Sequence, residues 1–265
     1  MGRRLGQHFL VRKSLLDRLA ESAAPGAARD KAQREPLIVE IGPGRGGLTE
    51  PLLERADRVV AIEVDPVLEH YLQHKFRDAI AAGRLELVLA DVLKTDLGAW
   101  GPCAIAGNLP YYITSPILER LFAARGAWSR AVFLVQSEVA ARLAAAPGCR
   151  DYGYLSVATQ IRAQVERLFE IPREAFKPPP KVLSEAVRLI PRASGLEDLA
   201  SFLQFAGVCF RQKRKTLRNN LLAAYGKEIA AELADPRLRA EQVSIPGLTS
   251  LHQRFRTLQA SHQLS

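Results

Sequence analysis

The chain contains a short segment whose residue types suit the recognition of an amine on an aromatic base. Asn108-Leu109-Pro110-Tyr111 directly follows an apolar run, Cys103 to Ala106. The exocyclic amine of adenine is a poor nucleophile, because its lone pair is delocalised into the purine ring. The side-chain carbonyl of Asn108 and an adjacent backbone carbonyl could accept its two N–H bonds, which favours a pyramidal nitrogen, while Tyr111 offers a stacking face. The same residues are also typical of an Asn-x-Pro turn beside a core tyrosine.

A glycine-rich segment, residues 40–49, lies where a strand should end and a helix should begin. Gly42 and Gly44 would let the backbone approach a ligand closely. Together with Gly47 they also satisfy the dinucleotide fingerprint Gly-x-Gly-x-x-Gly, so a nicotinamide cofactor and a plain structural turn are the alternatives. Glu40 favours S-adenosylmethionine. A carboxylate entering the loop would repel a pyrophosphate, whereas this methyl donor presents an ammonium group and a sulfonium centre.

Two further carboxylates follow predicted strands. Glu63 lies about 20 residues after the first glycine, the position from which an acidic side chain accepts hydrogen bonds from ribose hydroxyls. Asp65 is its rival, but if Asp65 caps the helix that starts at Pro66, Glu63 is left for the ribose. Asp91 could accept a hydrogen bond from the adenine amine of the cofactor, or it could be a capping or turn residue.

The elements that must position these residues alternate between two periodicities. Short apolar runs rich in β-branched residues predict strands at Leu37–Ile41, Val59–Glu63, Leu85–Ala90, Cys103–Gly107, Ala131–Gln136 and Val182–Ile190. Apolar residues at three- and four-residue spacing predict helices at Leu48–Arg55, Pro66–Ala82 and Pro116–Ala124, with prolines suited to a first turn. This alternation predicts an α/β fold with a mainly parallel sheet covered on both faces.

The strand pattern stops after Pro191, and the remaining chain has the pattern of helices with polar connectors. We therefore expect two domains, 1–191 with an N-terminal arm and 192–265 as a smaller helical domain. The boundary is expected between Pro191 and Gly195. The stretch from Ala23 to Glu35 is expected to connect the arm to the first strand.

Composition narrows the class of protein. The 265 residues are 48% hydrophobic and carry 37 Lys and Arg against 28 Asp and Glu, a formal charge of +9, which favours a polyanionic partner such as nucleic acid. Three cysteines, Cys103, Cys149 and Cys209, lie far apart without zinc-ligand spacing, so neither a disulfide framework nor a metal site is expected. Without a secretory or membrane-spanning apolar stretch, we expect a soluble cytoplasmic protein.

A basic cluster lies in the C-terminal part of the chain, where no acidic residue occurs from Leu199 to Lys227. Such a cluster is either a solvated face or a phosphate-binding surface, and the acid-free stretch favours phosphate contact. We expect RNA contact from Arg211, Lys213, Arg214, Lys215 and Arg218. Near the N-terminus, Arg3, Arg4, Arg12 and Lys13 could extend this footprint.

These segments together resemble the ribosomal RNA adenine dimethyltransferase family, and most closely its bacterial small-subunit branch. The resemblance covers nearly the whole chain. Besides the segments described above, it is carried by Leu5-Gly6-Gln7-His8-Phe9-Leu10, by Phe176-Lys177-Pro178-Pro179-Pro180-Lys181-Val182 and by residues 210–219. Several matching segments in order are far more specific than any one of them.

The resemblance implies a Rossmann-like class I methyltransferase fold and a role for each matching residue. It implies cofactor contact from His8, Leu10, Gly42, Gly44, Glu63, Asp91 and Asn108. Tyr111 and Phe176 would sandwich the target adenine, although Phe176 could instead be a partly buried loop aromatic anchored by the three prolines. His8 departs from the family, which usually has Asn there; its ring nitrogen keeps contact with the donor's carboxylate end possible, through a different geometry.

The implied activity is N6,N6-dimethylation of two adjacent adenosines in 16S ribosomal RNA during small-subunit assembly, by a monomer that needs no metal. In-line attack on the sulfonium methyl requires positioning rather than a covalent intermediate, which agrees with a chain that has no Ser-His-Asp or Cys-His arrangement. The alternatives are a large-subunit RNA methyltransferase, a DNA adenine methyltransferase, and a non-catalytic assembly or transcription factor with the same fold. The intact glycine loop and Asn108 argue against the last of these.

Overall fold

The computed structural model describes residues 8–26, 33–124 and 126–263. Arg3, Arg4 and the Leu5-Gly6-Gln7 part of the N-terminal motif lie outside the described residues, as do residues 27–32 of the expected connector. The chain divides into two compact units. The first comprises the chain up to Ala140 together with Val165–Pro191, and the second comprises Ala141–Gln164 together with the chain from Arg192 onward.

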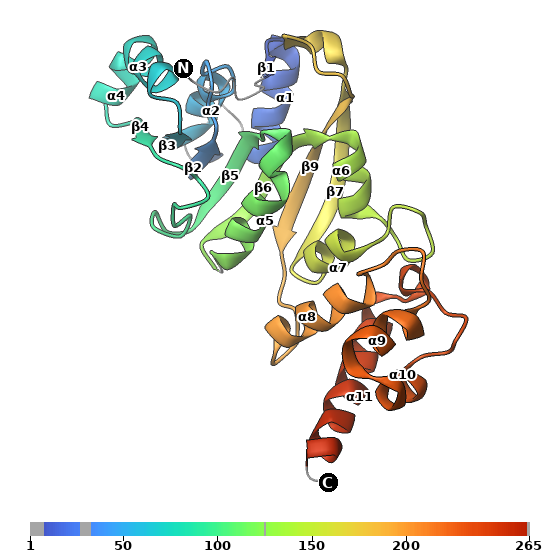
Figure 1. The fold of residues 1–265 in the computed structure, drawn as a ribbon. Helices are drawn as coiled ribbons and strands as arrows, with labels where there is room; N and C mark the ends of the chain where they lie inside the picture. The colour runs from blue at the N-terminus through green and yellow to red at the C-terminus, as the bar shows by residue number, and fades with distance from the viewer. Residues whose placement is uncertain (1–7, 27–32, 125, 264–265) are drawn as a thin grey trace. The chain divides into compact units, whose positions relative to one another are not determined.

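Among the described residues, the first unit is built on a seven-stranded sheet with the order β4-β3-β2-β5-β6-β9-β7 (Figure 1). The strands are β2 Glu35–Ile41, β3 Ala56–Glu63, β4 Leu85–Leu89, β5 Cys103–Asn108, β6 Trp128–Gln136, β7 Ala163–Ile171 and β9 Ser184–Pro191. Strands β4, β3, β2, β5 and β6 pair in parallel, whereas β9 runs antiparallel to β6. The carboxyl ends of the parallel strands therefore meet at one edge, and β9 brings its first residue to that edge.

Both faces of the sheet are buried, as the sequence predicts. Ala106 of β5 and Leu134 of β6 belong to one apolar cluster with residues of the N-terminal helices, while the alternating Ile105 and Phe133 point to the opposite face. All four side chains are fully buried. The helices of this unit are α1 Lys13–Ala23, α2 Thr49–Arg55, α3 Pro66–Lys75, α4 Arg77–Ala81 and α5 Thr114–Ala123, and α6 Ser137–Ala144 leads into the second unit.

A small two-stranded ladder ties the N-terminal arm to the loop before β9. Strand β1 Phe9–Leu10 pairs antiparallel with β8 Phe176–Lys177. Short 3-10 turns lie at Tyr111–Ile113 (η2), Arg173–Ala175 (η3) and Ala240–Gln242 (η4). Residues about 170 positions apart in the chain thus share one hydrogen-bonded element, since Phe9 lies opposite Lys177.

The second unit is helical and has its own core. Its helices are α7 Tyr154–Gln160, α8 Leu199–Cys209, α9 Leu217–Tyr225, α10 Lys227–Leu233 and α11 Ile245–Gln263. The expected boundary after Pro191 coincides with a division between the units, but residues 141–164, which the sequence analysis assigns to the first domain, group with the C-terminal helices. The reason is apolar packing, because Tyr152 and Val157 are buried in the same cluster as Phe202 and Phe205.

The local differences from the sequence prediction include a divided helix and an additional strand in the large sheet. The single helix expected over 66–82 is two helices, α3 and α4, which meet at Phe76. Strand β7 is the additional strand. It lies at the edge of the sheet, so its sequence AQVERLFEI is only partly buried and includes charged residues. Edge strands tolerate such charges, and these weaken the apolar pattern.

Candidate active site

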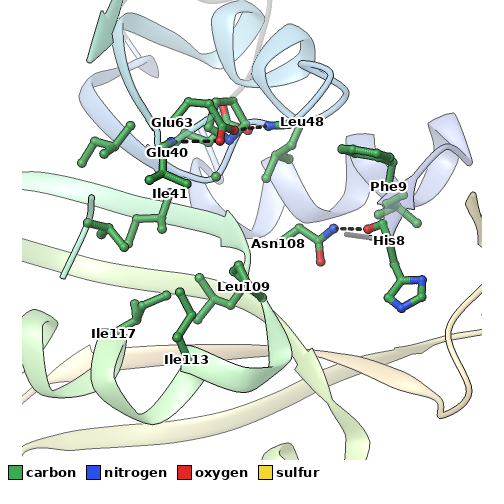
Figure 2. Close-up of a pocket in the computed structure, with 18 of the residues that line it drawn as sticks. His8, Phe9, Glu40, Ile41, Leu48, Glu63, Asn108, Leu109, Ile113 and Ile117 are labelled. Atoms are coloured by element: carbon green, nitrogen blue, oxygen red, sulfur yellow. Dashed lines mark hydrogen bonds between the residues drawn. The ribbon is translucent and has the colours of Figure 1, made fainter. Parts of the chain in front are cut away.

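A cavity of about 560 Å³ opens at the carboxyl edge of the parallel strands (Figure 2). Its walls come from the loop after β2, the ends of β3 and β5, the segment after β4 and the N-terminal arm. It brings together most of the residues that the sequence analysis selects, namely His8, Leu10, Gly42, Gly44, Glu63, Asp91, Asn108 and Tyr111. This is the position at which open α/β sheets bind ligands.

The glycine loop adopts a backbone that requires its glycines. Gly42 and Gly44 have φ angles of 68° and 57°, in the left-handed region that favours glycine. A Cβ atom on Gly44 would lie 2.8 Å from the Phe9 ring, whereas one on Gly42 would meet only the Asn108 carbonyl oxygen, at 3.9 Å. The backbone of the loop can therefore approach a ligand closely, and the ring of Phe9 fits against Gly44 because Gly44 has no side chain.

Glu63 is held at the cavity by backbone donors. Glu63 is 3% exposed, and its carboxylate accepts hydrogen bonds from the amides of Gly44 at 3.1 Å, Val64 at 2.9 Å and Asp65 at 3.0 Å. Burial raises its pKa, and these hydrogen bonds oppose that shift. A carboxylate has about four acceptor positions, so one remains for a ligand hydroxyl.

The predicted competition between the two neighbouring carboxylates is resolved by helix α3. Asp65 is its N-cap, accepting a hydrogen bond from the Val67 amide at 2.9 Å, and Pro66 follows in the first turn. The capping prediction is confirmed. Glu63 is accordingly the one of the two that lines the cavity.

Glu40 is a buried carboxylate beneath the loop. It is 1% exposed, and Thr49 donates a hydrogen bond to it at 2.6 Å. Burial raises its pKa to about 7, the nearby charge of Glu63 adds to the rise, and the Thr49 hydrogen bond opposes it. In its ionised form, the Glu40 carboxylate stabilises a cation placed in the cavity. Glu40 could be recognised from the sequence, whereas the contact of Thr49 with it depends on the turn between them.

Asp91 combines the two roles that the sequence left open. Its Oδ1 accepts a hydrogen bond from the Leu93 amide at 2.9 Å, which makes it a turn residue. It also lines the cavity beside Val92 and Leu93. One carboxylate oxygen thus fixes the turn, and the other can accept a hydrogen bond from a ligand.

The Asn108 amide has a defined orientation. Its Nδ2 donates a hydrogen bond at 2.9 Å to the backbone carbonyl of His8, as Figure 2 shows. Because that carbonyl can only accept, the nitrogen must face the arm. The oxygen Oδ1 therefore points the other way, where it can accept a hydrogen bond from an amine in the cavity.

Tyr111 lies in the turn η2 and is restrained on two sides. Its hydroxyl shares a hydrogen bond of 2.5 Å with Ser184, and its ring lies nearly parallel to that of His8, with 6.0 Å between centroids and an interplanar angle of 25°. Nδ1 of His8 contacts the carbonyl of Pro178 at 2.8 Å. The ring of His8 is thus directed toward Tyr111 and the proline segment.

Phe176, which is expected to stack on the target adenine with Tyr111, lies outside the cavity wall in this structure. It is 2% exposed and packs in the apolar cluster that contains Leu10, Leu19 and Ala175. The structure does not bring its ring into the cavity wall with Tyr111. It is buried because the β1–β8 ladder turns it inward opposite Leu10, so the alternative of a buried aromatic describes this structure and the stacking role stays a prediction.

The basic cluster belongs to the second unit. Arg211, Lys213, Arg214 and Lys215 are exposed in the loop between α8 and α9, and Arg218 is partly buried in the first turn of α9. Lys213 donates a hydrogen bond to the carbonyl of Arg150. The loop itself is anchored by the buried Asn220, which bonds the backbone of Cys209 and Gln212. Exposed cations on an anchored loop are suited to phosphate contact.

In residues 8–26, 33–124 and 126–263, no helix has the length and apolar character needed to cross a bilayer. Within the same ranges, no group of three or more His, Cys, Asp or Glu side chains is arranged to hold a metal ion.

Comparisons with known proteins agree on one family. The family model "Ribosomal RNA adenine dimethylase" matches residues 2–245. A relative from Acidobacterium capsulatum, named ribosomal RNA small subunit methyltransferase A, is 41% identical over 97% of this chain and 90% of its own length. A relative of the same name from Bordetella petrii is 39% identical over 92% of this chain and 90% of its own length.

Solved structures give the same result for the fold. A dimethyladenosine transferase from Plasmodium falciparum superposes with a TM-score of 0.78 at 25% identity, covering 94% of this chain and 98% of that one. The 23S rRNA methyltransferase ErmE has a TM-score of 0.70 at 27% identity, covering 94% of this chain and 99% of that one. The chain therefore belongs to the ribosomal RNA adenine dimethylase family, and it is a methyltransferase that uses S-adenosylmethionine as its methyl donor.

Proposed function

We propose that this enzyme dimethylates N6 of two adjacent adenosines in 16S ribosomal RNA during assembly of the small subunit, acting as a cytoplasmic monomer. The observation that carries the proposal is the orientation of Asn108, whose amide oxygen is turned toward the cavity because its nitrogen is bonded to the His8 carbonyl. The choice of the small subunit is supported by the names of the relatives near 40% identity.

The residues around the cavity fit the methyl donor. The glycine loop admits close backbone approach, and the remaining acceptor position of Glu63 suits a ribose hydroxyl. Asp91 has a carboxylate oxygen that can accept a hydrogen bond from the adenine amine of the donor. The donor itself supplies an electrophilic methyl group on its sulfonium. We assign Leu10 and the His8 backbone to the wall on the methionine side, and Glu40 to stabilising positive charge there.

Donor affinity is expected to depend on the ionisation of Glu40. Its pKa of about 7 means that the carboxyl is mostly protonated at pH 5.5 and mostly ionised at pH 7.5. A positively charged donor prefers the ionised form, so its dissociation constant should fall about tenfold as the pH rises over this interval. Calorimetric titration with S-adenosylmethionine at each pH measures the effect.

The variant Glu40→Gln provides the control for that titration. It keeps a side-chain carbonyl that can accept from Thr49 but has no proton to lose. We expect its donor affinity to be weak and nearly independent of pH. An equal pH slope in the variant and the wild type would assign the dependence to another group, such as the neighbouring Glu63.

Catalysis by these residues rests on positioning. Asn108 Oδ1 and a neighbouring backbone carbonyl accept the two N6 hydrogens, which localises the nitrogen lone pair toward the donor methyl. Tyr111 holds the base out of its stack, and base–aromatic stacking contributes about 1–3 kcal/mol. The amine becomes acidic only as it is alkylated, so the proposed mechanism needs no strong general base. We propose that Phe176 supports the site from the core, by holding β1 against β8.

The basic loop between α8 and α9 is proposed to bind RNA phosphates. Replacing Arg214 and Lys215 together by alanine should weaken binding of small-subunit RNA and reduce the slope of log K against log salt by about 1.5. The reason is that each lost phosphate contact removes the release of one counterion. Filter binding over a series of salt concentrations measures the slope.

A matched variant removes the same charge elsewhere. Arg58 and Arg77 are exposed cations of the first unit, on β3 and α4. Replacing both by alanine lowers the net charge equally but should leave the salt slope almost unchanged. If both double variants reduce the slope by the same amount, net charge rather than the basic loop accounts for binding.

The function is tested by supplying labelled S-adenosylmethionine with four acceptors: free small-subunit RNA, unmethylated small subunits, large-subunit RNA and duplex DNA. Mass analysis of the nucleosides should find N6,N6-dimethyladenosine in the small-subunit particles alone. Product in large-subunit RNA would instead favour methylation of 23S rRNA, the activity for which the structurally similar ErmE is named. Binding to every acceptor without product would support a non-catalytic assembly factor.

A further inference from the structure

Ser184 is a buried polar residue that the proposed mechanism does not use. It is fully buried, and its hydroxyl shares a hydrogen bond of 2.5 Å with the hydroxyl of Tyr111, 73 residues earlier in the chain. Tyr111 lines the cavity and carries the ring assigned to the acceptor base. A fully buried hydroxyl paired with the tip of that ring is suited to control where the ring lies.

The topology of the sheet explains how Ser184 reaches the site. In β5 and β6, Asn108 pairs with Leu134, and two residues later Gln136 pairs with Ser184 of β9. Because β9 runs antiparallel to β6, its first residue lies at the edge where the parallel strands end. A parallel strand would bring its last residue there instead. The sheet therefore delivers the Ser184 hydroxyl to the end at which Asn108 and Tyr111 lie.

We propose that Ser184 is a positioning residue for methyl transfer: it fixes the Tyr111 ring so that a base stacked on it presents its amine to Asn108. This proposal rests on the acceptor role of Tyr111 in the proposed function. A tyrosine ring turns about two side-chain bonds, and its hydroxyl oxygen lies on the axis of the second, so a hydrogen bond at the hydroxyl restrains the swing of the ring about the first bond. Movement of the ring would displace the stacked base relative to the fixed oxygen of Asn108.

Two contacts restrain the Tyr111 ring, one from Ser184 and one from His8. The His8 ring lies nearly parallel to the Tyr111 ring at a centroid distance of 6.0 Å and is itself held by the Pro178 carbonyl. That contact limits movement of the ring along one direction, and the Ser184 hydroxyl limits the swing of its tip. Burial raises the pKa of the Tyr111 hydroxyl and the Ser184 hydrogen bond lowers it, so ionisation of Tyr111 reports the contact.

The test is a double-mutant cycle of Ser184→Ala, Tyr111→Phe and the two combined, measured as KM for small-subunit RNA and as kcat. Each single variant should raise KM about fivefold, the effect of one hydrogen bond, without changing the dissociation constant of S-adenosylmethionine. The double variant should be no worse than either single variant, because both remove the same contact. Additive effects, or an unchanged KM in Ser184→Ala, would overturn the proposal.

Ser156→Ala is the matched control for stability. Ser156 is also a fully buried serine, but it lies in the second unit and donates to the Arg142 carbonyl at 2.6 Å. It should lower the melting temperature about as much as Ser184→Ala while leaving KM unchanged. If Ser156→Ala raises KM equally, the effect of Ser184 is one of general stability and the positioning role is excluded.

A second readout separates this proposal from the proposed function. The ultraviolet difference titration of wild type against Tyr111→Phe isolates the ionisation of Tyr111 and needs no substrate. Ser184→Ala should move that ionisation to higher pH, since the hydrogen bond that lowers the pKa is lost. If Ser184→Ala shifts the ionisation of Tyr111 but the enzyme methylates no RNA, the contact is supported and the proposed function is rejected. If the enzyme methylates RNA and Ser184→Ala changes neither the ionisation of Tyr111 nor KM, the role of Ser184 is rejected.

Discussion

Replacing Asn108 by alanine is expected to reduce kcat for methyl transfer by about 10²–10³, the cost of losing one preorganised hydrogen-bonding group from an active site. The variant removes the oxygen that accepts from the target amine. It also removes the nitrogen that bonds the His8 carbonyl at 2.9 Å. Single-turnover assays with saturating small subunits measure the chemical step, and calorimetry should find the dissociation constant of S-adenosylmethionine raised by less than about tenfold.

Asn220→Ala is the appropriate comparison for this variant. Asn220 is a buried amide of the second unit that bonds the Cys209 carbonyl at 2.9 Å, so its loss should cost stability and weaken RNA binding by the loop that it anchors, without lowering the rate of the chemical step at saturating subunits. Full turnover by Asn108→Ala would reject the proposed activation of the amine. A loss of donor binding as large as the loss in rate would instead assign Asn108 mainly to the cofactor.

Replacing Gly44 by alanine is expected to raise the dissociation constant of S-adenosylmethionine by more than about tenfold. A non-glycine residue in the left-handed region costs about 1–3 kcal/mol, and here the added Cβ would also lie 2.8 Å from the Phe9 ring. Relief of that contact displaces either the arm or the loop. Either displacement disturbs the Gly44 amide, which donates to Glu63 at 3.1 Å.

Gly83→Ala separates backbone strain from the disturbance of the site. Gly83 has a φ of 69°, close to that of Gly44, but a Cβ there meets nothing within 4 Å. It follows α4, and the cavity it lines is a separate one beside β4. Both variants should lose stability in thermal unfolding through backbone strain, Gly44→Ala at least as much as Gly83→Ala, and only Gly44→Ala should lose donor affinity. Equal donor affinity in the two would show that the loop tolerates a side chain at Gly44.

The sequence by itself determined six of the seven strands of the large sheet and the functional residues that follow several of them. Glycines after β2, a carboxylate at the end of β3 and Asn108 at the end of β5 are local features, because periodicity and turn chemistry depend on near neighbours. The cap at Asp65 was predictable for the same reason, since it needs only Pro66 and the following turn. Strand β7 was missed because its edge position removes the apolar pattern.

Only the tertiary structure decided which groups face the cavity and in what orientation. The Asn108 amide is oriented by His8, 100 residues away, and the Tyr111 hydroxyl by Ser184, 73 residues away. Phe176 is turned into the core by the β1–β8 ladder, and residues 141–164 join the helical unit through Tyr152 and Val157. The physical reason is common to all four. Each depends on a contact that forms only when distant segments pack, and such a contact leaves no periodicity in the sequence around it.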